Sequence, residues 1–253
     1  MPLLLNRRQF CGTAGAAVVA LTAACGASAA RDGGRLFARP RKTPAAGAPP
    51  PQPGQRVLGL QKNRDAVLRI PPKVTDAMPL LLMLHGAGGA GDRMLARVSA
   101  YTDEAGIAVL SPSSADASWD AIRGDFGADA AMIDKALTKV FDQLPIDPNR
   151  VVIGGFSDGA SYALSLGLIN GDLFKRIVAF SPGFVVGGEI HARPSIFISH
   201  GMEDQILPYD RCGKRIATEL KSKGFDVTFR DFHGGHEIPP DIGRAAMAWA
   251  IGA

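Results

Sequence analysis

The stretch Val151-Val152-Ile153-Gly154-Gly155-Phe156-Ser157-Asp158-Gly159-Ala160 decides the fold of this chain. An apolar, β-branched run leads directly into the pattern Gly-x-Ser-x-Gly, and residues 160–168 then have the composition of a helix. A strand that becomes a helix within a few residues forces a sharp turn, and flanking glycines remove the Cβ atoms that would collide there. The pattern predicts that Ser157 lies at the tip of this turn with its hydroxyl exposed. Because glycines at this spacing also occur where a serine only caps a helix, the assignment depends on the rest of the chain.

The composition indicates one globular domain. The 253 residues are 46% hydrophobic and 21% charged, which is enough to bury one sizeable core, and no internal repeat is visible. Residues 1–54 hold seven of the 28 Lys and Arg residues but one of the 24 Asp and Glu residues, so residues 55–253 carry 21 basic and 23 acidic side chains. The main part of the chain is therefore not basic, and its composition gives no support for binding nucleic acid.

The first 29 residues have the features of an export signal. Asn6-Arg7-Arg8-Gln9-Phe10 precedes a run of small apolar residues from Ala14 to Ala24, which is too short to span a bilayer as a helix. Twin arginines followed by Phe resemble the signal of the twin-arginine export route, and an ordinary secretion signal that happens to hold two arginines is the alternative. We therefore expect an exported protein, periplasmic or extracellular.

Two processing sites compete at the end of this signal. Ala27-Ser28-Ala29 fits the small-x-small pattern of signal peptidase, whereas Leu21-Thr22-Ala23-Ala24-Cys25-Gly26 resembles a lipobox with Thr22 in place of the usual bulky aliphatic residue. Lipidation of Cys25 would anchor the protein to a membrane, and we expect no other membrane contact. Cys212 is then the single thiol of the mature domain, and we expect it to be a packing or surface residue rather than a nucleophile.

Residues 30–54 separate this signal from the domain. They are rich in Pro and Ala and include Pro49-Pro50-Pro51. Such a composition cannot bury enough apolar surface to offset the cost of ordering the chain, so it predicts an extended tether. The folded domain is expected over residues 55–253.

The domain alternates strand-like and helix-like segments. Its middle strands are continuous apolar runs, as a parallel sheet covered on both faces requires, and its helices repeat apolar residues at spacings of three and four. This order predicts an α/β fold with a mostly parallel central sheet of about eight strands flanked by helices, with ligands at the carboxyl ends of the strands. The expected strands are 56–60, 66–70, 80–84, 107–110, 151–154, 177–180, 195–199 and 227–232, and the expected helices are 92–105, 129–143, 158–169, 211–223 and 238–251.

Residues suited to acyl-transfer chemistry follow four of these strands. After the third strand comes His85-Gly86-Ala87-Gly88-Gly89, and exposed N–H groups on such a glycine-rich loop can stabilise an oxyanion without reorganising. Ser157 follows the fifth strand, His200-Gly201-Met202-Glu203-Asp204 follows the seventh, and His233-Gly234-Gly235-His236 follows the eighth. Nucleophile, acid and base therefore occur in the order Ser, Asp, His, each just past a strand end.

These motifs resemble those of the α/β-hydrolases over about residues 56–251. The chain is similar in particular to the small bacterial esterases grouped with phospholipase/carboxylesterases and polyhydroxybutyrate-depolymerase-like enzymes. The resemblance implies the α/β-hydrolase fold, with Ser157 as nucleophile, His236 as base and Asp204 as the acid that orients it. It also implies an oxyanion hole made by the backbone N–H groups of Ala87 and Asp158. The motifs that carry it are His85-Gly-Ala-Gly-Gly89, Gly155-Phe-Ser-Asp-Gly159, Phe180-Ser-Pro-Gly183, His200-Gly-Met-Glu-Asp204 and Gly234-Gly-His236.

The chemistry of such a set favours a serine esterase. A serine hydroxyl is a poor nucleophile until an imidazole accepts its proton, and the imidazole needs a carboxylate to fix its tautomer. We therefore expect hydrolysis of small-molecule carboxylic esters through an acyl-enzyme, without a cofactor. We expect no metal either, because His233 and His236 lack a third ligand. A thioesterase or serine peptidase with the same triad, and a non-catalytic binding module with this fold, remain alternatives.

Neighbouring residues compete for two of these roles. His233 lies three residues before His236 and could also reach a serine, but the Gly-Gly-His context and the family pattern favour His236. Glu203 adjoins Asp204, and Asp210 is a weaker candidate for the acid. We expect His233 to be packed beside the site and Glu203 to be solvated.

Other aromatic and histidine side chains near the strand ends have structural or pocket roles. His85 and His200 each precede a glycine, and we expect them to satisfy backbone groups of their loops. Trp119 and Phe184 are expected to wall the substrate pocket, the alternative for each being an ordinary core aromatic. The connection over residues 184–193 is short, which predicts no large lid and an open site suited to short acyl chains. The sequence predicts neither the natural substrate nor the oligomeric state.

Overall fold

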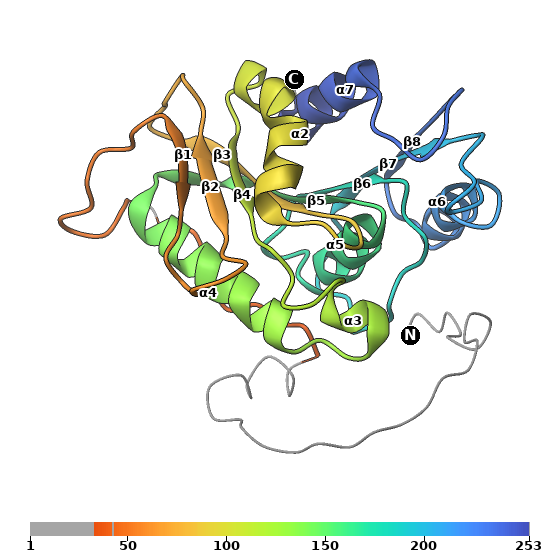
Figure 1. Ribbon diagram of the computed structural model, residues 1–253, viewed down its shortest axis with the longest axis horizontal. Helices are drawn as coiled ribbons and strands as arrows, with labels where there is room; N and C mark the ends of the chain where they lie inside the picture. Colours follow the sequence, from red (N-terminus) through yellow and green to blue (C-terminus); the bar gives the residue numbers. More distant parts are fainter. Residues whose placement is uncertain (1–32, 42, 253) are drawn as a thin grey trace.

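The structure, a computed structural model, describes residues 33–41 and 43–252 of the chain, and one sheet of eight strands forms its centre (Figure 1). The strands are β1 (Gly54–Val57), β2 (Val67–Ile70), β3 (Met78–Leu84), β4 (Ala108–Ser111), β5 (Ile146–Phe156), β6 (Arg176–Phe180), β7 (Ser195–Gly201) and β8 (Val227–Phe232). The helices are α2 (Gly91–Glu104), α3 (Asp120–Arg123), α4 (Ala128–Gln143), α5 (Asp158–Ile169), α6 (Gly213–Ser222) and α7 (Pro240–Ile251).

The strands lie in the order β1-β2-β4-β3-β5-β6-β7-β8. β1 pairs with β2 and β2 with β4 in antiparallel fashion, whereas all pairs from β4 through β8 are parallel. The carboxyl ends of β3, β5, β7 and β8 therefore meet at one edge of the sheet. This confirms the predicted α/β fold with a mostly parallel sheet, and it brings the four candidate motifs to the same edge.

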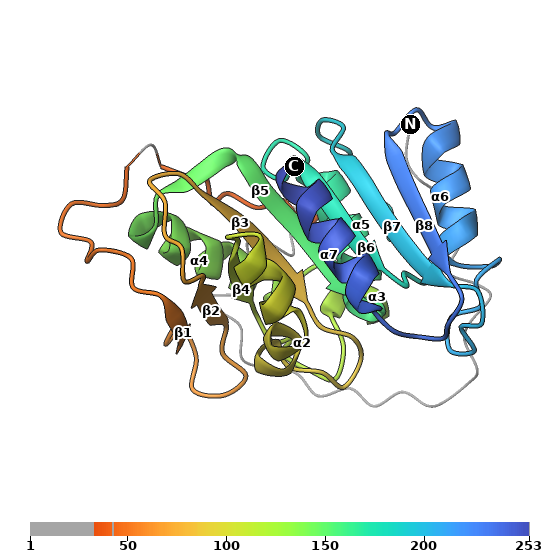
Figure 2. The same ribbon diagram turned by 90° about the horizontal axis from the view of Figure 1, so that it is seen from above.

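Helices cover both faces of the sheet (Figure 2). Leu81 and Met83 of β3 pack in one apolar cluster with residues of α2 and α7, and the alternate residues Leu80 and Leu82 pack in a second cluster with residues of α4, α5 and α6. Successive side chains of a strand point to opposite faces, so a continuous apolar strand requires cover on both sides. The apolar runs of the sequence thus predict the three-layer arrangement that the structure has.

The sequence predicts the elements well and their ends less well. Each of the eight expected strands and five expected helices overlaps an observed element. β5 begins at Ile146 rather than Val151, because Ile146 pairs with Met78 across a register shift. The four-residue helix α3 was not expected, since four residues are too few to show a helical period. The connection from β6 to β7, residues 181–194, is described in full and holds no lid-sized element.

Part of the segment expected to be a tether, residues 30–54, is packed against the domain. Leu36 is fully buried in the larger apolar cluster, and its N–H donates to Oδ1 of Asn170 at 2.8 Å. Arg35 forms an ion pair of 2.8 Å with Asp172 just beyond α5. The prediction of a free tether is therefore wrong here, because composition averaged over 25 residues conceals two buried apolar residues, Leu36 and Ala38, with polar partners on other parts of the chain.

The predicted export signal, residues 1–29 with Cys25, lies outside the described residues, and its role and processing stay predictions. Among the helices of residues 33–41 and 43–252, none combines the length and the apolar character needed to cross a membrane. The proposed division of the chain into signal, linker and domain is likewise not tested by these contacts, apart from the packing of Leu36.

We predict that Leu36→Ala lowers the free energy of unfolding by about 2–5 kcal/mol, because a fully buried leucine is replaced by a cavity. Urea unfolding of the domain measures this loss. Phe37→Ala is the matched control, since Phe37 is 63% exposed and its truncation should change stability by no more than about 0.5 kcal/mol. Equal, small effects of both changes would show that residues 34–38 do not pack on the domain in solution.

Candidate active site

Ser157 lies at a strained turn between β5 and α5. Its backbone has φ 59° and ψ −122°, a conformation that costs a residue other than glycine on the order of 1–3 kcal/mol. A Cβ atom on Gly155 would lie 2.1 Å from the carbonyl oxygen of Gly159, and one on Gly159 would lie 2.3 Å from the carbonyl oxygen of Leu84. Both positions therefore accept only glycine. The steric reason inferred from Gly-x-Ser-x-Gly is confirmed.

The loops after β7 and β8 bring Asp204 and His236 together. Nδ1 of His236 lies 2.6 Å from Oδ2 of Asp204, while Oδ1 of Asp204 accepts the backbone N–H groups of Ile206 and Leu207 at 2.9 Å each. Burial of the carboxyl raises its pKa, but the Leu207 amide and the His236 ring lower it more, so the pKa of Asp204 lies below its usual value. The ionised carboxylate therefore holds the proton of the imidazole on Nδ1 and leaves Nε2 free to act as a base.

The nucleophile candidate is next to this pair. Phe156 precedes Ser157, and its ring lies 4.7 Å from the ring of His236 between centroids. Within residues 33–41 and 43–252, no hydrogen bond joins the Ser157 hydroxyl to His236. Bonds of this kind are often long without substrate and tighten when it binds. The structure thus unites the predicted acid and base directly, and places the serine one residue from their aromatic neighbour.

The loop after β3 lies against the serine turn. A Cβ atom on Gly86 would be 3.1 Å from Cβ of Ser157, so the two segments are in contact. Gly88 has φ 65° and donates its N–H to the carbonyl oxygen of Ala117 at 2.6 Å, which fixes the loop beyond Ala87. Ala87 itself is exposed. Ala87 therefore lies at the surface, on a loop that touches the serine turn.

Asp158, the second predicted oxyanion residue, opens helix α5. The first N–H groups of a helix have no partner within it, so the Asp158 amide is suited to bind a negative charge. The side chain of Asp158 is held separately, because its carboxylate accepts a hydrogen bond of 2.6 Å from the hydroxyl of Ser118. The backbone roles predicted for Ala87 and Asp158 fit this geometry and remain predictions.

Trp119 does not line a pocket. Its side chain is fully buried between the rings of His85, at 4.8 Å, and Tyr162, at 5.2 Å, and its indole N–H donates to the carbonyl oxygen of His85 at 2.8 Å. The predicted pocket role is therefore wrong: Trp119 is a core aromatic that supports the start of the loop after β3. Phe184 is half-buried and remains a candidate for the pocket wall.

The two histidines expected to serve their loops do so. His85 donates from Nδ1 to the carbonyl oxygen of Gly86 at 2.7 Å and accepts the N–H of Ser114 at Nε2, and burial lowers its pKa. His200 donates from Nε2 to the carbonyl oxygen of Leu207 at 2.7 Å. The same nitrogen lies 3.2 Å from Oδ2 of Asp204, a contact with the candidate acid that the sequence did not predict.

The competing residues are exposed or engaged elsewhere. The side chain of His233 is 89% exposed, so it is not packed beside the site as expected, and its nearest acidic partner is Glu203 at 3.9 Å. Glu203 is solvated, as predicted, and Asp210 forms an ion pair of 2.8 Å with Lys214. Cys212 is buried and burial raises the pKa of its thiol, which agrees with a packing role. Among the described residues, no group of His, Cys, Asp and Glu could hold a metal ion.

A buried pair of carboxyls behind the site was not expected from the sequence. Oδ2 of Asp129 accepts the backbone N–H of Asp120, Oδ2 of Asp120 accepts that of Asp129, and the hydroxyl of Tyr162 donates to Asp120 at 2.9 Å. Burial raises the pKa of Asp129 to about 6, and the charge of Asp120 adds to this. Asp129 also accepts the N–H of Ala115, so the pair fastens the loop that carries Ser118 and Trp119. Aspartates before a helix are common caps, but their spacing does not reveal such a pairing.

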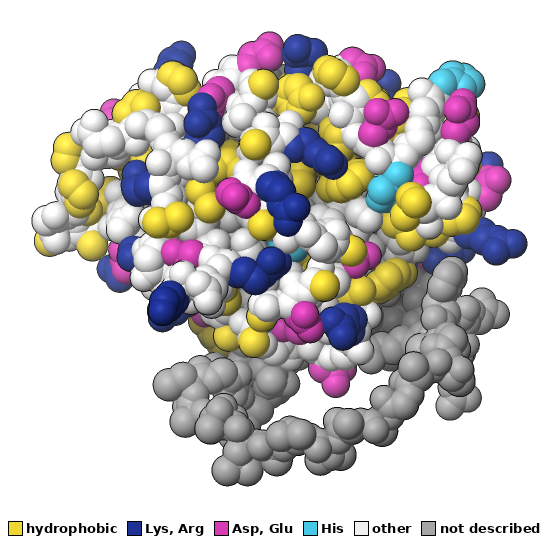
Figure 3. Space-filling model, in the orientation of Figure 1, with side chains coloured by type: hydrophobic (Ala, Val, Ile, Leu, Met, Phe, Trp, Pro, Cys, Tyr) yellow, Lys and Arg dark blue, Asp and Glu magenta, His cyan; other side chains and the backbone are white. Residues whose placement is uncertain are grey.

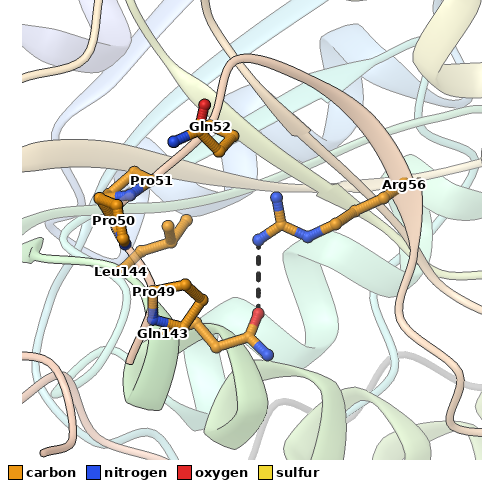
Figure 4. A pocket seen from close by; sticks show the side chains of 7 residues that line it. All are labelled: Pro49, Pro50, Pro51, Gln52, Arg56, Gln143 and Leu144. Carbon is orange, nitrogen blue, oxygen red and sulfur yellow. Dashed lines mark hydrogen bonds between the residues drawn. The ribbon is translucent and has the colours of Figure 1, made fainter. Parts of the chain in front are cut away.

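A separate hollow lies between the segment before β1 and the end of α4 (Figure 4). Arg56 on one side of it donates to the side-chain oxygen of Gln143 on the other, at 3.4 Å. None of its lining residues belongs to a candidate motif. Those residues are Pro49, Pro50, Pro51, Gln52, Arg56, Gln143 and Leu144.

The comparison with protein families agrees with this geometry. Residues 111–247 match the phospholipase/carboxylesterase family, and the matched range contains Ser157, Asp204 and His236. The chain belongs to this family. It is therefore a member of a family of carboxylic ester hydrolases, with the fold that the motifs of the sequence predicted.

Individual relatives of this family member are distant. Acyl-protein thioesterase 1 of Gibberella zeae is 31% identical over 106 residues, which cover 38% of the chain and 45% of that protein. The chain thus spans less than half the length of this curated relative. Among solved structures, esterase PE8 is 24% identical with a TM-score of 0.57 over 68% of the chain and 91% of its own. The Bacillus cereus carboxylesterase is 21% identical with a TM-score of 0.58 over 73% and 92%. Both share the fold.

We predict that Asp129 makes stability depend on pH. Its folded pKa of about 6 lies above the ordinary value of 3.8, so the folded chain binds this proton more tightly than the unfolded chain. The contribution to stability is complete below about pH 4 and is lost as the pH rises through about 6. The asparagine of Asp129→Asn does not titrate. The amount by which this variant is less stable than the natural chain, measured as the free energy of unfolding, should therefore shrink by about 1–3 kcal/mol between pH 5 and pH 8.

Urea unfolding at several pH values measures this deficit. Glu203→Gln is the control, because Glu203 is exposed and its removal should give a difference in stability that varies little over the same range. A deficit for Asp129→Asn that stays constant or grows with pH would contradict the raised pKa.

Proposed function

We propose that the chain is a serine hydrolase that cleaves carboxylic esters through an acyl-enzyme, with Ser157 as nucleophile, His236 as base and Asp204 as its orienting acid. The observation that carries this proposal is the 2.6 Å bond between His236 and Asp204 at the same sheet edge as the strained turn of Ser157. A buried carboxylate and an imidazole with a free Nε2 are what a serine hydroxyl needs to become nucleophilic.

The proposed reaction has two steps, acylation and deacylation of Ser157, and the same residues act in both. In the first, Nε2 of His236 takes the proton of the Ser157 hydroxyl while the oxygen bonds to the ester carbonyl carbon. The N–H groups of Ala87 and Asp158 bind the resulting oxyanion. His236 then gives its proton to the leaving alcohol as the ester C–O bond breaks. In the second step water replaces the alcohol, is deprotonated by His236 and releases the acid from Ser157.

Two features bear on the substrate. The short connection over residues 181–194 leaves the site without a large lid, which favours small, accessible esters with short acyl chains, and Phe184 at its start is the candidate wall for the acyl group. Thioesters are the second candidate, since three relatives are named acyl-protein thioesterases. The same attack on a thioester carbonyl differs only in the leaving group, so one panel of 4-nitrophenyl esters, acyl thioesters and peptides ranks these classes.

We predict that Ser157→Ala and His236→Ala reduce ester hydrolysis to the residual rate that substrate binding and the oxyanion hole provide on their own. Asp204→Asn should lower kcat by about 10⁴-fold, because the neutral amide no longer fixes the tautomer of the imidazole. Steady-state kinetics with 4-nitrophenyl butanoate measures both effects. The matched control is Glu203→Gln, one residue away and solvated, which should change kcat by less than about twofold.

Labelling separates an enzyme from a binding module. A fluorophosphonate should modify Ser157 in the natural chain and nothing in Ser157→Ala, as read by mass spectrometry of the intact and digested protein. A folded chain that remains unlabelled and hydrolyses no ester would favour the non-catalytic alternative.

A further inference from the structure

Two arginines of helix α2 face the candidate active site. Arg93 and Arg97 are four residues apart, so they lie on the same face of the helix, and both are exposed. The guanidinium of Arg97 lies 4.8 Å from the centroid of the Phe156 ring. That ring is also 4.7 Å from the ring of His236. A permanent cation and the candidate base therefore contact the same aromatic side chain, next to Ser157.

Arg93 reaches the other side of the site. Its guanidinium donates a hydrogen bond of 2.9 Å to the carbonyl oxygen of Gly88, in the loop that carries Ala87. The segment between Gly86 and Gly88 packs against the serine turn, since a Cβ atom on Gly86 would lie 3.1 Å from Cβ of Ser157. One face of α2 thus presents a cation to each flank of the proposed reaction centre.

Among the residues that the structure describes, no carboxylate forms a direct ion pair with these two cations. In residues 33–41 and 43–252, neither Arg93 nor Arg97 has an ion-pair partner, although Asp92 is adjacent in sequence. The carboxylate of Asp92 accepts the backbone N–H of Arg93 instead, and that of Asp158 is taken by Ser118. Figure 3 shows Lys and Arg side chains over the α2 region of this face, beside acidic and hydrophobic side chains and a histidine. Within the described residues, both guanidinium groups therefore lie beside the candidate site without a direct ion pair, although the carboxylates of Asp92 and Asp158 are nearby.

We propose that Arg93 and Arg97 bind a second, anionic oxygen group of the substrate, so that the preferred substrates are carboxylic esters that also carry a free carboxylate. This inference rests on the ester hydrolysis proposed above. Guanidinium groups suit it, because they stay charged at all relevant pH values and match the planar geometry of a carboxylate with two N–H donors. The free carboxylate can belong to the acid part or to the alcohol part of the ester. Both present the same group to the two arginines, so the test has one arm for each.

A purely structural role explains less of the geometry. A guanidinium over an aromatic ring contributes modest stability at an exposed position, and this accounts for Arg97 alone. The hydrogen bond from Arg93 to Gly88 likewise holds the loop. Neither contact explains why two guanidinium groups of one helix face flank the proposed reaction centre without a direct ion pair in the described residues. Elsewhere the chain does pair exposed arginines, as between Arg123 and Asp116 at 2.9 Å.

The test compares anionic esters with neutral esters of nearly the same shape. For the acid arm these are mono-4-nitrophenyl glutarate and its methyl ester, and for the alcohol arm 4-acetoxybenzoate and its methyl ester. The measured quantity is the ratio of kcat/KM for the anionic ester to kcat/KM for the neutral one. A contact with an exposed cation is worth about fivefold, so we expect Arg97→Gln and Arg93→Gln each to lower the ratio about fivefold in one arm. The ratio of the natural chain should also fall with added salt, because the screening length drops from about 30 Å at 0.01 M to about 3 Å at 1 M.

Two variants control for effects on folding and packing. Arg97→Lys keeps the charge over Phe156 and should retain more of the ratio than Arg97→Gln. Lys135→Gln removes one exposed positive charge from α4, which covers the opposite face of the sheet, and should leave the ratio unchanged. A loss of activity on both members of a pair without a change in ratio would assign Arg97 a structural role and overturn the proposal.

Binding gives a readout that needs no turnover. Monomethyl glutarate should bind the Ser157→Ala chain more tightly than dimethyl glutarate in an equilibrium titration, and Arg97→Gln in that background should remove the difference. Absence of ester hydrolysis with this binding preference intact would refute the proposed function while supporting the anionic site. Equal binding of both compounds, or an unchanged ratio in both kinetic arms, would refute the anionic site alone.

Discussion

The turn at Ser157 is the constraint on which the site depends. The parallel strand β5 and the helix α5 meet within one residue because Ser157 adopts φ 59° and because Gly155 and Gly159, two positions to either side, lack Cβ atoms. The strain is held in place by α5, whose side chains from Gly159 to Ile169 are all buried, and by β6, whose Phe180 accepts the N–H of Ser157 at 2.9 Å. The fold thus forces one hydroxyl out at the sheet edge where the loops of β3, β7 and β8 also end.

Each of those loops is fastened by buried polar groups rather than by apolar contacts alone. His85 and Trp119 tie the loop after β3 to the loop after β4, and the pair Asp120 and Asp129 ties that second loop to α4. His200 and two backbone N–H groups hold Asp204 on the far side. Buried hydrogen bonds of this kind favour one geometry, because breaking them leaves further polar groups without a partner. This explains how exposed loops hold the site residues in fixed positions relative to one another.

Much of the fold was predictable because the spacing of apolar residues and the positions of turn-forming glycines are local signals in the sequence. Continuous apolar runs required a covered parallel sheet, and Gly-x-Ser-x-Gly required the serine turn. The pairing of Asp204 with His236 was implied by the resemblance to the α/β-hydrolases, and it is possible because parallel strands end at one edge. What the sequence did not reveal depends on partners distant in the chain. Trp119 reads as a pocket aromatic until its neighbours His85 and Tyr162 are known, and Leu36 reads as linker until Asn170 is beside it.

The serine, the imidazole and the two backbone amides have to converge on one reacting carbon if the chain works as proposed. A crystal structure of the chain after reaction with a small fluorophosphonate tests this most directly. The prediction is a phosphorus bonded to Oγ of Ser157, one phosphoryl oxygen about 2.7–3.1 Å from the N–H groups of both Ala87 and Asp158, and Nε2 of His236 within hydrogen-bond reach of Oγ. An adduct on another residue, or a phosphoryl oxygen turned away from both amides, would contradict it.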